Sequence, residues 1–560
     1  MRRIIIIAAG PAGIACATRI KRRLYEHEIN VIIPSAVTAK ERFDGPAGRR
    51  FAALLPDVDA LALREIGVLE TDDLMPDLEA KEITVGSSRG RLTVRYSDLV
   101  LEVPATVRPP HSLRKANNVF VWPMPGFAAR PADCDAALAG AAASGEQVVV
   151  TGNGAPALEA ALLALEAGAK VHWLRTAQAE SPALEEQLLG VAIQALGPNL
   201  TVSALPGTAA EELIFHLDAD GKKLVGLGLP TDNSRIDCAC CIWTAPLMAR
   251  HPILREEGLV LDKKGRIIIN DPAKCPGLRL MGSGSALENT RLPLSDVLLE
   301  SFPGGEENAD LSAWLAINDI TRQADASTLP KALGVRYASG AGIQFRRAGL
   351  SMAEAQARNL DCEYACVSLP LESTQSAAEQ GLLALSLVCD KDSRALLGAQ
   401  ALGTGLAASE TDGLFGLALA GLADGVSVSS LARRSPTGLP GALLQRACAV
   451  LVNKLDTIIQ GITPEEFLAS RAAGAEFFTL DLRSLPDWKQ GHVPGAYNIP
   501  LAQLKKRIQD EVPRFTPIVT VSASGRDAYV AACRMAGLGA KDLYVLDGGM
   551  ALWPFKLERE

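Results

Sequence analysis

Residues 4–15 read IIIIAAGPAGIA, and this stretch decides how the chain begins to fold. Four consecutive isoleucines at 4–7 are typical of a strand that is buried on both faces of a parallel sheet. The glycines behind them permit a tight turn, and apolar residues at 14–25 recur at helical spacing. Residues 29–34, INVIIP, then predict a second strand. The sequence therefore opens with one strand–turn–helix–strand unit.

Residues 146–175 repeat this pattern, with the strand EQVVV, the turn TGNGAPA, the helical stretch LEAALLALEAGA and the strand KVHWLR. Units of this kind build Rossmann-type domains, in which a glycine-rich turn and a helix N-terminus receive the phosphates of a nucleotide. Two such units predict two nucleotide-binding domains, the second inserted in the first. The stretch 264–288 would then return to the first domain.

The character of the sequence changes after about residue 333. A short helical pattern and strands lead into Ala/Leu-rich helical sequence, and two short strands, FFTLDLR at 477–483 and PIVTVSA at 517–523, alternate with helices near the end. We therefore expect an α/β protein with two Rossmann-like nucleotide-binding domains, an α+β domain and a small C-terminal α/β domain. The expected limits are 1–115 with 255–330 for the first, 116–254 for the second, 331–460 for the third and 461–560 for the fourth.

Composition excludes several classes of protein. The 560 residues are 48% hydrophobic and 21% charged, which suits a globular chain with sizeable cores. A net charge of −8 without a basic run argues against nucleic-acid binding. No apolar run is long enough for a membrane span, and the arginines at the N-terminus lead into a strand and turn rather than a signal peptide. Eleven cysteines are too few for a disulfide framework, so a cytoplasmic setting is expected.

The cysteines of the CACC cluster at 238–241 could hold a metal or act in redox chemistry, or they could pack inside a strand. We favour packing, because the surrounding sequence reads as a buried strand and a free thiol packs as a small hydrophobe. His492 is interpreted as a hydrogen-bonded turn residue. The other histidines lack the spacing of metal ligands, so no metal site is expected.

Two motifs in the last domain, GHVPGAYNIP at 491–500 and LDGGMALW at 546–553, resemble a rhodanese-type module. The third domain carries GLSMAEAQARNLD at 349–361 and RALLGAQALG at 394–403. In this order the whole chain resembles the pyridine nucleotide-disulfide oxidoreductase family, in the coenzyme A-disulfide reductase or NADH oxidase branch with a C-terminal rhodanese domain. The resemblance implies FAD in the first domain, NAD(P)H in the second, a redox cysteine, and dimerisation through the third.

The first turn only partly matches the family. Gly10, Pro11 and Gly13 keep a bare backbone at the helix start, where the resemblance places the FAD pyrophosphate. The acidic group that would accept hydrogen bonds from the ribose is replaced by Pro34, which removes a contact worth roughly 1.5–3 kcal/mol. If FAD binds, Ser35 is a neighbour that could supply a replacement contact.

Other family positions have also changed. The nucleophilic cysteine of the family corresponds to Phe43, and a phenyl ring cannot attack a disulfide. Pro104 replaces a glycine of the family motif Y-D-x-L-x-x-A-T-G, and the flavin-contacting Gly-Asp pair becomes Gly284 and Ser285. We therefore expect FAD binding to be weak or absent.

The second turn keeps Gly152 and Gly154, with Ala157 in place of the third glycine. Arg175 stands where an acidic residue would select NAD(H), which favours NADP(H) if either nucleotide binds. Trp243 replaces a glycine of a later family turn, and its indole could fill the nicotinamide channel. The sequence therefore makes NADP(H) a less expected cofactor than FAD.

The rhodanese loop has lost its nucleophile. The family pattern C-x-x-G-x-R becomes Ser522, Gly525 and Asp527 at its three fixed positions. A serine hydroxyl cannot carry a persulfide, and Asp527 places a negative charge where an arginine would stabilise an anion. No catalytic residue is therefore expected at either degenerate position, Phe43 or Ser522.

Two hypotheses follow. In the first, the chain is a pseudoenzyme that has lost thiol and persulfide chemistry and serves as a scaffold. In the second, it is an active oxidoreductase that passes electrons from NAD(P)H through FAD to a partner protein. The folding frame survives at each degenerate site, which favours the scaffold. In both cases we expect a homodimer through 331–460, a protein complex partner, no nucleic acid and no membrane span.

Overall fold

The computed structural model describes the chain in segments. The described residues are 2–8, 11–33, 61–71, 73–87, 90–103, 105–107, 109–122, 132–176, 184–230, 234–244, 247–249, 256–261, 266–282, 317–318, 320–321, 335–372, 380–405, 407–434, 438–456, 459–513 and 515–559. They form two compact units, one of residues 1–181 and 201–334 and one of residues 182–200 and 335–560. No described helix is long and apolar enough to cross a membrane.

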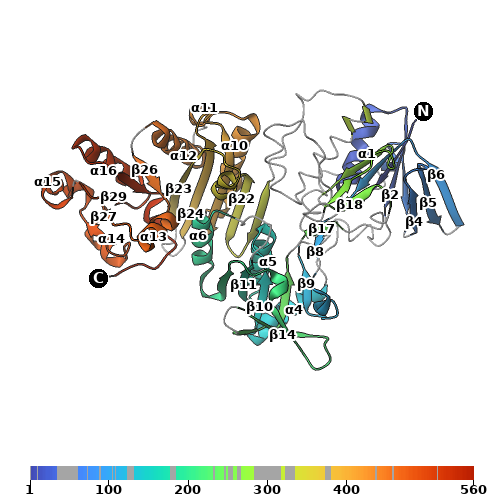
Figure 1. The fold of residues 1–560 in the computed structure, drawn as a ribbon, viewed down its shortest axis with the longest axis horizontal. Helices are drawn as coiled ribbons and strands as arrows, with labels where there is room; N and C mark the ends of the chain where they lie inside the picture. Colours follow the sequence, from blue (N-terminus) through green and yellow to red (C-terminus); the bar gives the residue numbers. More distant parts are fainter. Residues whose placement is uncertain are drawn as a thin grey trace. The chain divides into compact units, whose positions relative to one another are not determined.

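The first unit begins with the expected strand, helix and second strand, of which the helix (α1) and the second strand (β2) are labelled in Figure 1. Its first sheet is parallel in the order β20-β7-β1-β2-β3. The members are β1 (Arg3–Ile7), β2 (Glu28–Ile33), β3 (Ile66–Glu70), β7 (Asp98–Glu102) and β20 (Leu278–Met281), with α1 (Pro11–Arg23) after β1. β20 lies in the stretch expected to return to this domain, and it pairs with β7.

Strand β1 is buried on both faces, as the isoleucine run predicted. Ile4 and Ile6 pack in one core cluster with Ile14 and Ile20 of α1. Residues 5 and 7 pack in a second cluster on the opposite face, together with β7 residues. This alternation holds β1 between two hydrophobic layers, one of which includes α1.

A group of smaller strands belongs to the same unit. They are β4 (Leu74–Asp77), β5 (Glu82–Ser87) and β6 (Gly90–Arg95) in one antiparallel sheet, β8 (Ala105–Val107) with β17 (Leu247–Ala249), and β18 (Leu259–Leu261) with β19 (Ile267–Ile269). A 3-10 turn, η1 (His111–Leu113), precedes the second domain.

The second Rossmann-like sheet has the order β12-β11-β10-β16-β9. Its elements are β9 (Val119–Val121), α4 (Ala132–Ser144), β10 (Gln147–Thr151), α5 (Ala155–Glu166), β11 (Lys170–Thr176), β12 (Leu200–Leu205) and β16 (Cys240–Trp243). The antiparallel strands β13 (Ile214–Leu217), β14 (Leu224–Gly228) and β15 (Arg235–Asp237) lie beside it with η3 (Ala210–Glu212), whereas η2 (Gly197–Asn199) belongs to the second compact unit. Helix α6 (Glu186–Leu196), although inside the range predicted for this domain, belongs to the second compact unit.

The third domain is an antiparallel sheet covered by helices, as expected for an α+β fold. The strand order is β21-β22-β25-β24-β23. The elements are β21 (Arg336–Gly340), β22 (Ile343–Gly349), α9 (Met352–Ala357), β23 (Cys362–Glu372), β24 (Gln380–Asp390), β25 (Leu396–Gly405), η6 (Ala408–Glu410), α10 (Thr411–Asp424), α11 (Val428–Arg434) and α12 (Leu439–Asp456).

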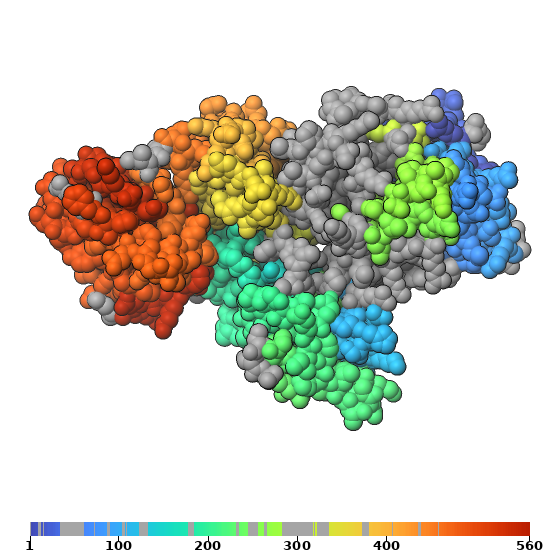
Figure 2. Space-filling view, viewed as in Figure 1, coloured from blue at the N-terminus to red at the C-terminus, as the bar shows by residue number. Residues whose placement is uncertain are grey.

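The C-terminal domain is a parallel sheet in the order β26-β30-β29-β27-β28. The elements are β26 (Gln460–Ile462), α13 (Pro464–Ala472), β27 (Phe478–Asp481), α14 (Leu485–Gln490), β28 (Tyr497–Asn498), α15 (Leu501–Glu511), β29 (Ile518–Val521), α16 (Arg526–Gly537), β30 (Leu543–Leu546) and η7 (Gly549–Leu552). In the space-filling view this domain (orange to red) abuts the third domain of the same unit (Figure 2).

A buried polar network joins these two domains of the second unit. The ammonium of Lys454 on α12 lies 2.8 Å from a carboxylate oxygen of Asp547, which follows β30, and it donates to the carbonyl of Tyr364 at 2.6 Å. Gln187 of α6 donates to the Asp547 carbonyl at 2.7 Å and accepts from the Tyr364 hydroxyl at 3.2 Å. The side chains of Lys454 and Asp547 are 9% and 5% exposed, so their charges depend on each other for compensation.

We expect Asp547→Asn to destabilise the C-terminal domain by about 3–5 kcal/mol, because it leaves the buried Lys454 charge with only the Glu363 carboxylate, 3.8 Å away, as a counter-ion. Loss of hydrogen-exchange protection in β29 and β30 of the full-length chain measures the effect. The double variant Lys454→Met with Asp547→Leu should recover most of the protection, since a hydrophobic pair replaces the charges. Protection that is unchanged in the single variant would show that the pair does not hold the domains.

Candidate functional site

The start of helix α1 holds an acidic side chain. The backbone N–H of Gly13, in the first turn of α1, donates to Oε2 of Glu102 at 2.8 Å. Glu102 ends the neighbouring strand β7, and its side chain is buried, with 6% of the residue exposed. A Cβ added at Gly13 would lie 2.6 Å from this carboxylate oxygen and 2.6 Å from the Ala8 Cβ. Glycine is therefore needed at position 13 for the close approach of helix and strands.

The Glu102 carboxylate lies at a helix start, where the phosphates of a dinucleotide would also bind. The first N–H groups of a helix have no partner within the helix, and with the helix dipole they attract an anion, such as a pyrophosphate. Here the Glu102 carboxylate provides that negative charge from inside the chain. Two like unit charges 4 Å apart repel by about 4 kcal/mol at an effective dielectric constant of 20. At the described start of α1, the Gly13 N–H is therefore already bonded to an anionic side chain of the protein.

The contact between Glu102 and the Gly13 N–H was not predicted from the sequence. The signal was present, since the family motif Y-D-x-L-x-x-A-T-G has an alanine where this chain has Glu102, two positions before the glycine replaced by Pro104. Several predicted site residues lie outside the described residues, and the side chain of Pro11 is not described. Those outside are Gly10, Pro34, Ser35, Phe43, Pro104, Gly284 and Ser285.

The thiol nearest to this turn is not a substitute nucleophile. Cys16 is fully buried in α1. Burial raises the pKa of its thiol to about 12, with a further contribution from the charge of Glu102. Because the thiolate is the nucleophile, a thiol with such a pKa is inert at neutral pH.

The second turn is better preserved. Gly152 has φ of 125°, its N–H donates to the Leu174 carbonyl at 3.0 Å, and its carbonyl accepts from the Trp173 indole at 2.7 Å. Gly154 is the N-cap of α5, and no described side chain caps it. Pro156, in the first turn of α5, has no N–H, which removes one donor from the surface that would face a phosphate.

Arg175 lies close to this turn, as its predicted role requires. Its Nε donates to the side-chain oxygen of Asn153 at 2.9 Å, so the guanidinium is positioned beside the glycines. Trp243, by contrast, is fully buried and packs edge-on against Phe215 with ring centroids 6.0 Å apart. Its indole lies in the hydrophobic core of the second domain, and its Nε1 has no hydrogen-bond partner among the described residues. The second turn therefore fits a nucleotide better than the first.

In the rhodanese loop a serine hydroxyl occupies a ring of backbone donors. The Ser522 Oγ accepts from the N–H of Gly525 at 3.0 Å and from that of Ala528 at 3.2 Å. Its carbonyl accepts from the N–H of Met550 at 2.9 Å. Gly549, at φ of 62°, leaves no room for a Cβ, which would lie 2.4 Å from the Ser522 carbonyl oxygen. The Ser522 hydroxyl therefore satisfies two backbone N–H groups, those of Gly525 and Ala528.

His492 is held in its turn, as predicted. Its Nδ1 lies 2.9 Å from the Trp488 carbonyl, its ring stacks on the Trp488 indole at 4.0 Å, and its backbone pairs with Glu558. These contacts give the imidazole a structural role at the edge of the C-terminal domain.

The CACC cysteines are buried, as the packing interpretation predicted. Burial raises the pKa of Cys238 and Cys240 to about 12 each, and that of Cys241 well above the usual value. Cys238 and Cys241 have C-x-x-C spacing, but thiols with such pKa values are unsuited to redox exchange. No group of metal-binding side chains occurs within the segments that the structure describes.

Comparison with known proteins agrees with this architecture. Residues 2–278 match the pyridine nucleotide-disulphide oxidoreductase family and residues 463–554 match the rhodanese-like domain. The chain belongs to the pyridine nucleotide-disulphide oxidoreductase family and carries a C-terminal rhodanese-like domain.

Among curated proteins, the thiosulfate sulfurtransferase GlpE of Pseudomonas fluorescens is 30% identical over 92 residues, which are 16% of this chain and 82% of GlpE. The Bacillus subtilis protein YqhL is 32% identical over 101 residues, which are 18% of this chain and 77% of YqhL.

Two solved structures share the fold of nearly the whole chain. Reduced CoADR-RHD of Bacillus anthracis matches with a TM-score of 0.77 at 19% sequence identity, and the match covers 99% of this chain and 97% of that protein's chain. The NAD-dependent persulfide reductase of A. fulgidus matches with a TM-score of 0.73 at 19% sequence identity, and the match covers 98% of this chain and 100% of that protein's chain.

We expect Glu102→Ala to strengthen FAD binding at least tenfold relative to the wild type, because it frees the Gly13 N–H and removes the opposing charge. Fluorescence titration of FAD into the full-length proteins measures this. Glu102→Gln should gain less, since an amide of the same size still fills the site, and Glu26→Ala on the surface should change nothing. Equal affinities in the wild type and Glu102→Ala would contradict the assignment.

We expect the wild-type chain to show no thiosulfate:cyanide sulfurtransferase activity, because Ser522 cannot carry a persulfide. Ser522→Cys should acquire one sulfur atom from thiosulfate, detected by intact-protein mass spectrometry, since two N–H groups then face a thiolate. Ser524→Cys, on the same loop, is the matched control and should not. Wild-type turnover above background would overturn the prediction.

Proposed function

We propose that this chain is a non-catalytic member of its family that acts as a scaffold in a protein complex. The proposal rests on one hydrogen bond: the Gly13 backbone N–H donates to Oε2 of the buried Glu102 side chain, with 2.8 Å between nitrogen and oxygen. This bond lies at the helix start, where a dinucleotide pyrophosphate would bind. An enzyme that depends on FAD would gain nothing from an internal anion at this place. The first Rossmann-like domain is therefore a folding unit rather than a flavin site.

The loss of thiol chemistry supports the same conclusion. The names of the two similar structures indicate that those proteins act as a persulfide reductase and as a reductase with a rhodanese domain. This chain has Phe43 where the family resemblance places the redox cysteine and Ser522 where it places the persulfide-carrying cysteine. Ten of its eleven cysteines are buried, and Cys533 alone is exposed. A thiolate at either chemical position is therefore absent from the sequence.

The scaffold role requires assembly. We propose a homodimer through residues 331–460, the domain that the family resemblance assigns to dimerisation, and a further protein partner in the cytoplasm. The domain limits given from the sequence are part of this proposal. Support comes from the third domain's antiparallel sheet of five strands and its three following helices, which are complete in the described residues apart from short gaps.

One observation favours the alternative function, thiol-independent electron transfer from NAD(P)H through FAD to a partner protein. The turn at Gly152 and Gly154 keeps its geometry, and Arg175 lies beside it, where it could contact the 2′-phosphate of NADP(H). Pro156 weakens this site but does not close it.

The visible spectrum and the oligomeric state of the purified full-length protein separate the two functions. The scaffold predicts a colourless dimer that does not oxidise NADH or NADPH when FAD is added. Flavin absorbance near stoichiometric amounts, together with bleaching by NADPH, would contradict the scaffold and establish electron transfer. Colourless monomers would contradict the assembly proposed for residues 331–460.

A further inference from the structure

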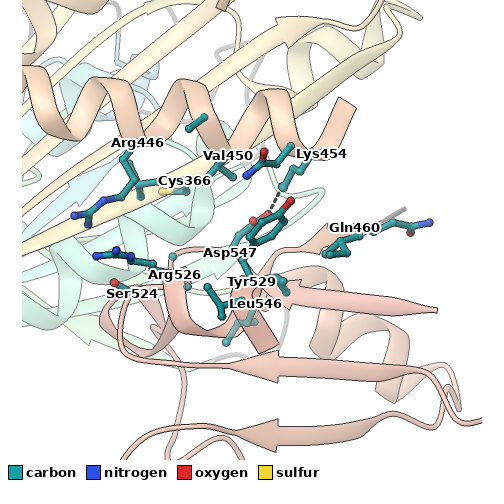
Figure 3. A pocket seen from close by; sticks show the side chains of 18 residues that line it. Cys366, Arg446, Val450, Lys454, Gln460, Ser524, Arg526, Tyr529, Leu546 and Asp547 are labelled. Atoms are coloured by element: carbon teal, nitrogen blue, oxygen red, sulfur yellow. Dashed lines mark hydrogen bonds and ion pairs between the residues drawn. The ribbon is translucent and has the colours of Figure 1, made fainter. Parts of the chain in front are cut away.

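A cavity of about 360 Å³ lies within the second unit, between helix α12 of the third domain and the C-terminal domain. Figure 3 shows the side chains that line it. This volume is at the lower end of the range typical of small-molecule sites, which is about 300–1,000 Å³. The cavity is thus large enough for a small organic molecule.

Side chains from two helices, α12 and α16, line opposite parts of the cavity. From α12 come Arg446, Val450 and Lys454, at spacings of four residues, and from α16 come Arg526 and Tyr529, at a spacing of three. Residues three or four positions apart lie on one face of a helix, so each helix presents a continuous strip to the cavity. The space between them is lined by further apolar side chains, namely Val367, Val530, Val545 and Leu546.

Of the three basic side chains that line the cavity, Lys454, Arg446 and Arg526, one has a carboxylate partner among the residues that the structure describes. Lys454 is neutralised by Asp547 at 2.8 Å. Arg446 donates to the Ser368 carbonyl at 3.2 Å, which carries no net charge, and Arg526 is exposed. Within the described part of the chain no carboxylate forms an ion pair with either guanidinium. Figure 3 shows both arginines extending to the same side of the view, away from Lys454.

We propose that this cavity binds a small organic anion, with its acidic group on Arg446 and Arg526 and its hydrocarbon body along the apolar walls. A guanidinium binds a carboxylate or phosphate in a planar, bidentate manner, which favours an acid over a neutral ligand. The apolar walls favour a hydrocarbon body over a purely inorganic anion.

The binding is non-covalent and separate from the lost sulfur chemistry. The Ser522 hydroxyl is turned toward the loop's own N–H groups, whereas Ser524, Gly525 and Arg526 of the same loop line the cavity. The cavity's one thiol, Cys366, is 2% exposed and has no role as a nucleophile in this proposal. The site goes beyond the scaffold function, because it gives the junction of two domains a small-molecule ligand.

Titration calorimetry of the full-length protein with octanoate, octyl phosphate and octanol tests the proposal. We expect saturable binding of at least one anion, at least tenfold tighter than that of octanol. Arg446→Gln and Arg526→Gln should each weaken it at least fivefold, while Arg434→Gln, an exposed arginine of α11, should leave it unchanged. The tighter of the two anions identifies the acid class.

A second variant keeps the test independent of the arginines. Val450→Trp fills the cavity from α12 and should abolish binding, while hydrogen exchange of the C-terminal strands confirms that the variant is folded. The proposal is overturned if neither anion shows saturable binding to the wild type. It is equally overturned if binding is unaffected by both Arg526→Gln and Val450→Trp.

Discussion

Backbone N–H groups at the start of a buried helix must find an acceptor, and in this chain Glu102 supplies one for helix α1. The carboxylate lies at the end of β7, the helix begins after β1, and these two strands are neighbours in the parallel sheet. The isoleucine strand therefore fixes the position of the helix start, and the adjacent strand delivers the charge. In a dinucleotide-binding domain a ligand would lie at the helix start, and here a side chain of the protein itself accepts from the Gly13 N–H.

The rhodanese loop satisfies its donors in the same manner. The hydroxyl oxygen of Ser522 accepts two backbone hydrogen bonds, at 3.0 and 3.2 Å. Both sites thus keep the fold of the family and place a side-chain oxygen of the chain where a ligand or a sulfur atom would otherwise sit. At the α5 turn the N-cap is Gly154, which has no side chain to cap the helix, and Arg175 lies close by through its bond to Asn153.

The sequence predicted the architecture well, because buried strands, glycine turns and helical spacing are local patterns. The loss of thiol chemistry inferred from two positions, Phe43 and Ser522, stays a prediction. The sequence could not show where the Glu102 side chain points, since this depends on the register of β7 against β1. Nor could it show that the Trp243 indole packs in a core instead of filling a nucleotide channel. The cavity beside Arg446 and Arg526 was equally hidden, because its walls come from segments about 80 residues apart.

A crystal structure of the full-length protein grown with excess FAD tests the central claim most directly. The account predicts that the Glu102 carboxylate remains hydrogen-bonded to the Gly13 N–H and that no pyrophosphate lies at the start of α1. A pyrophosphate oxygen bonded to the Gly13 N–H, with the Glu102 side chain turned away, would contradict it.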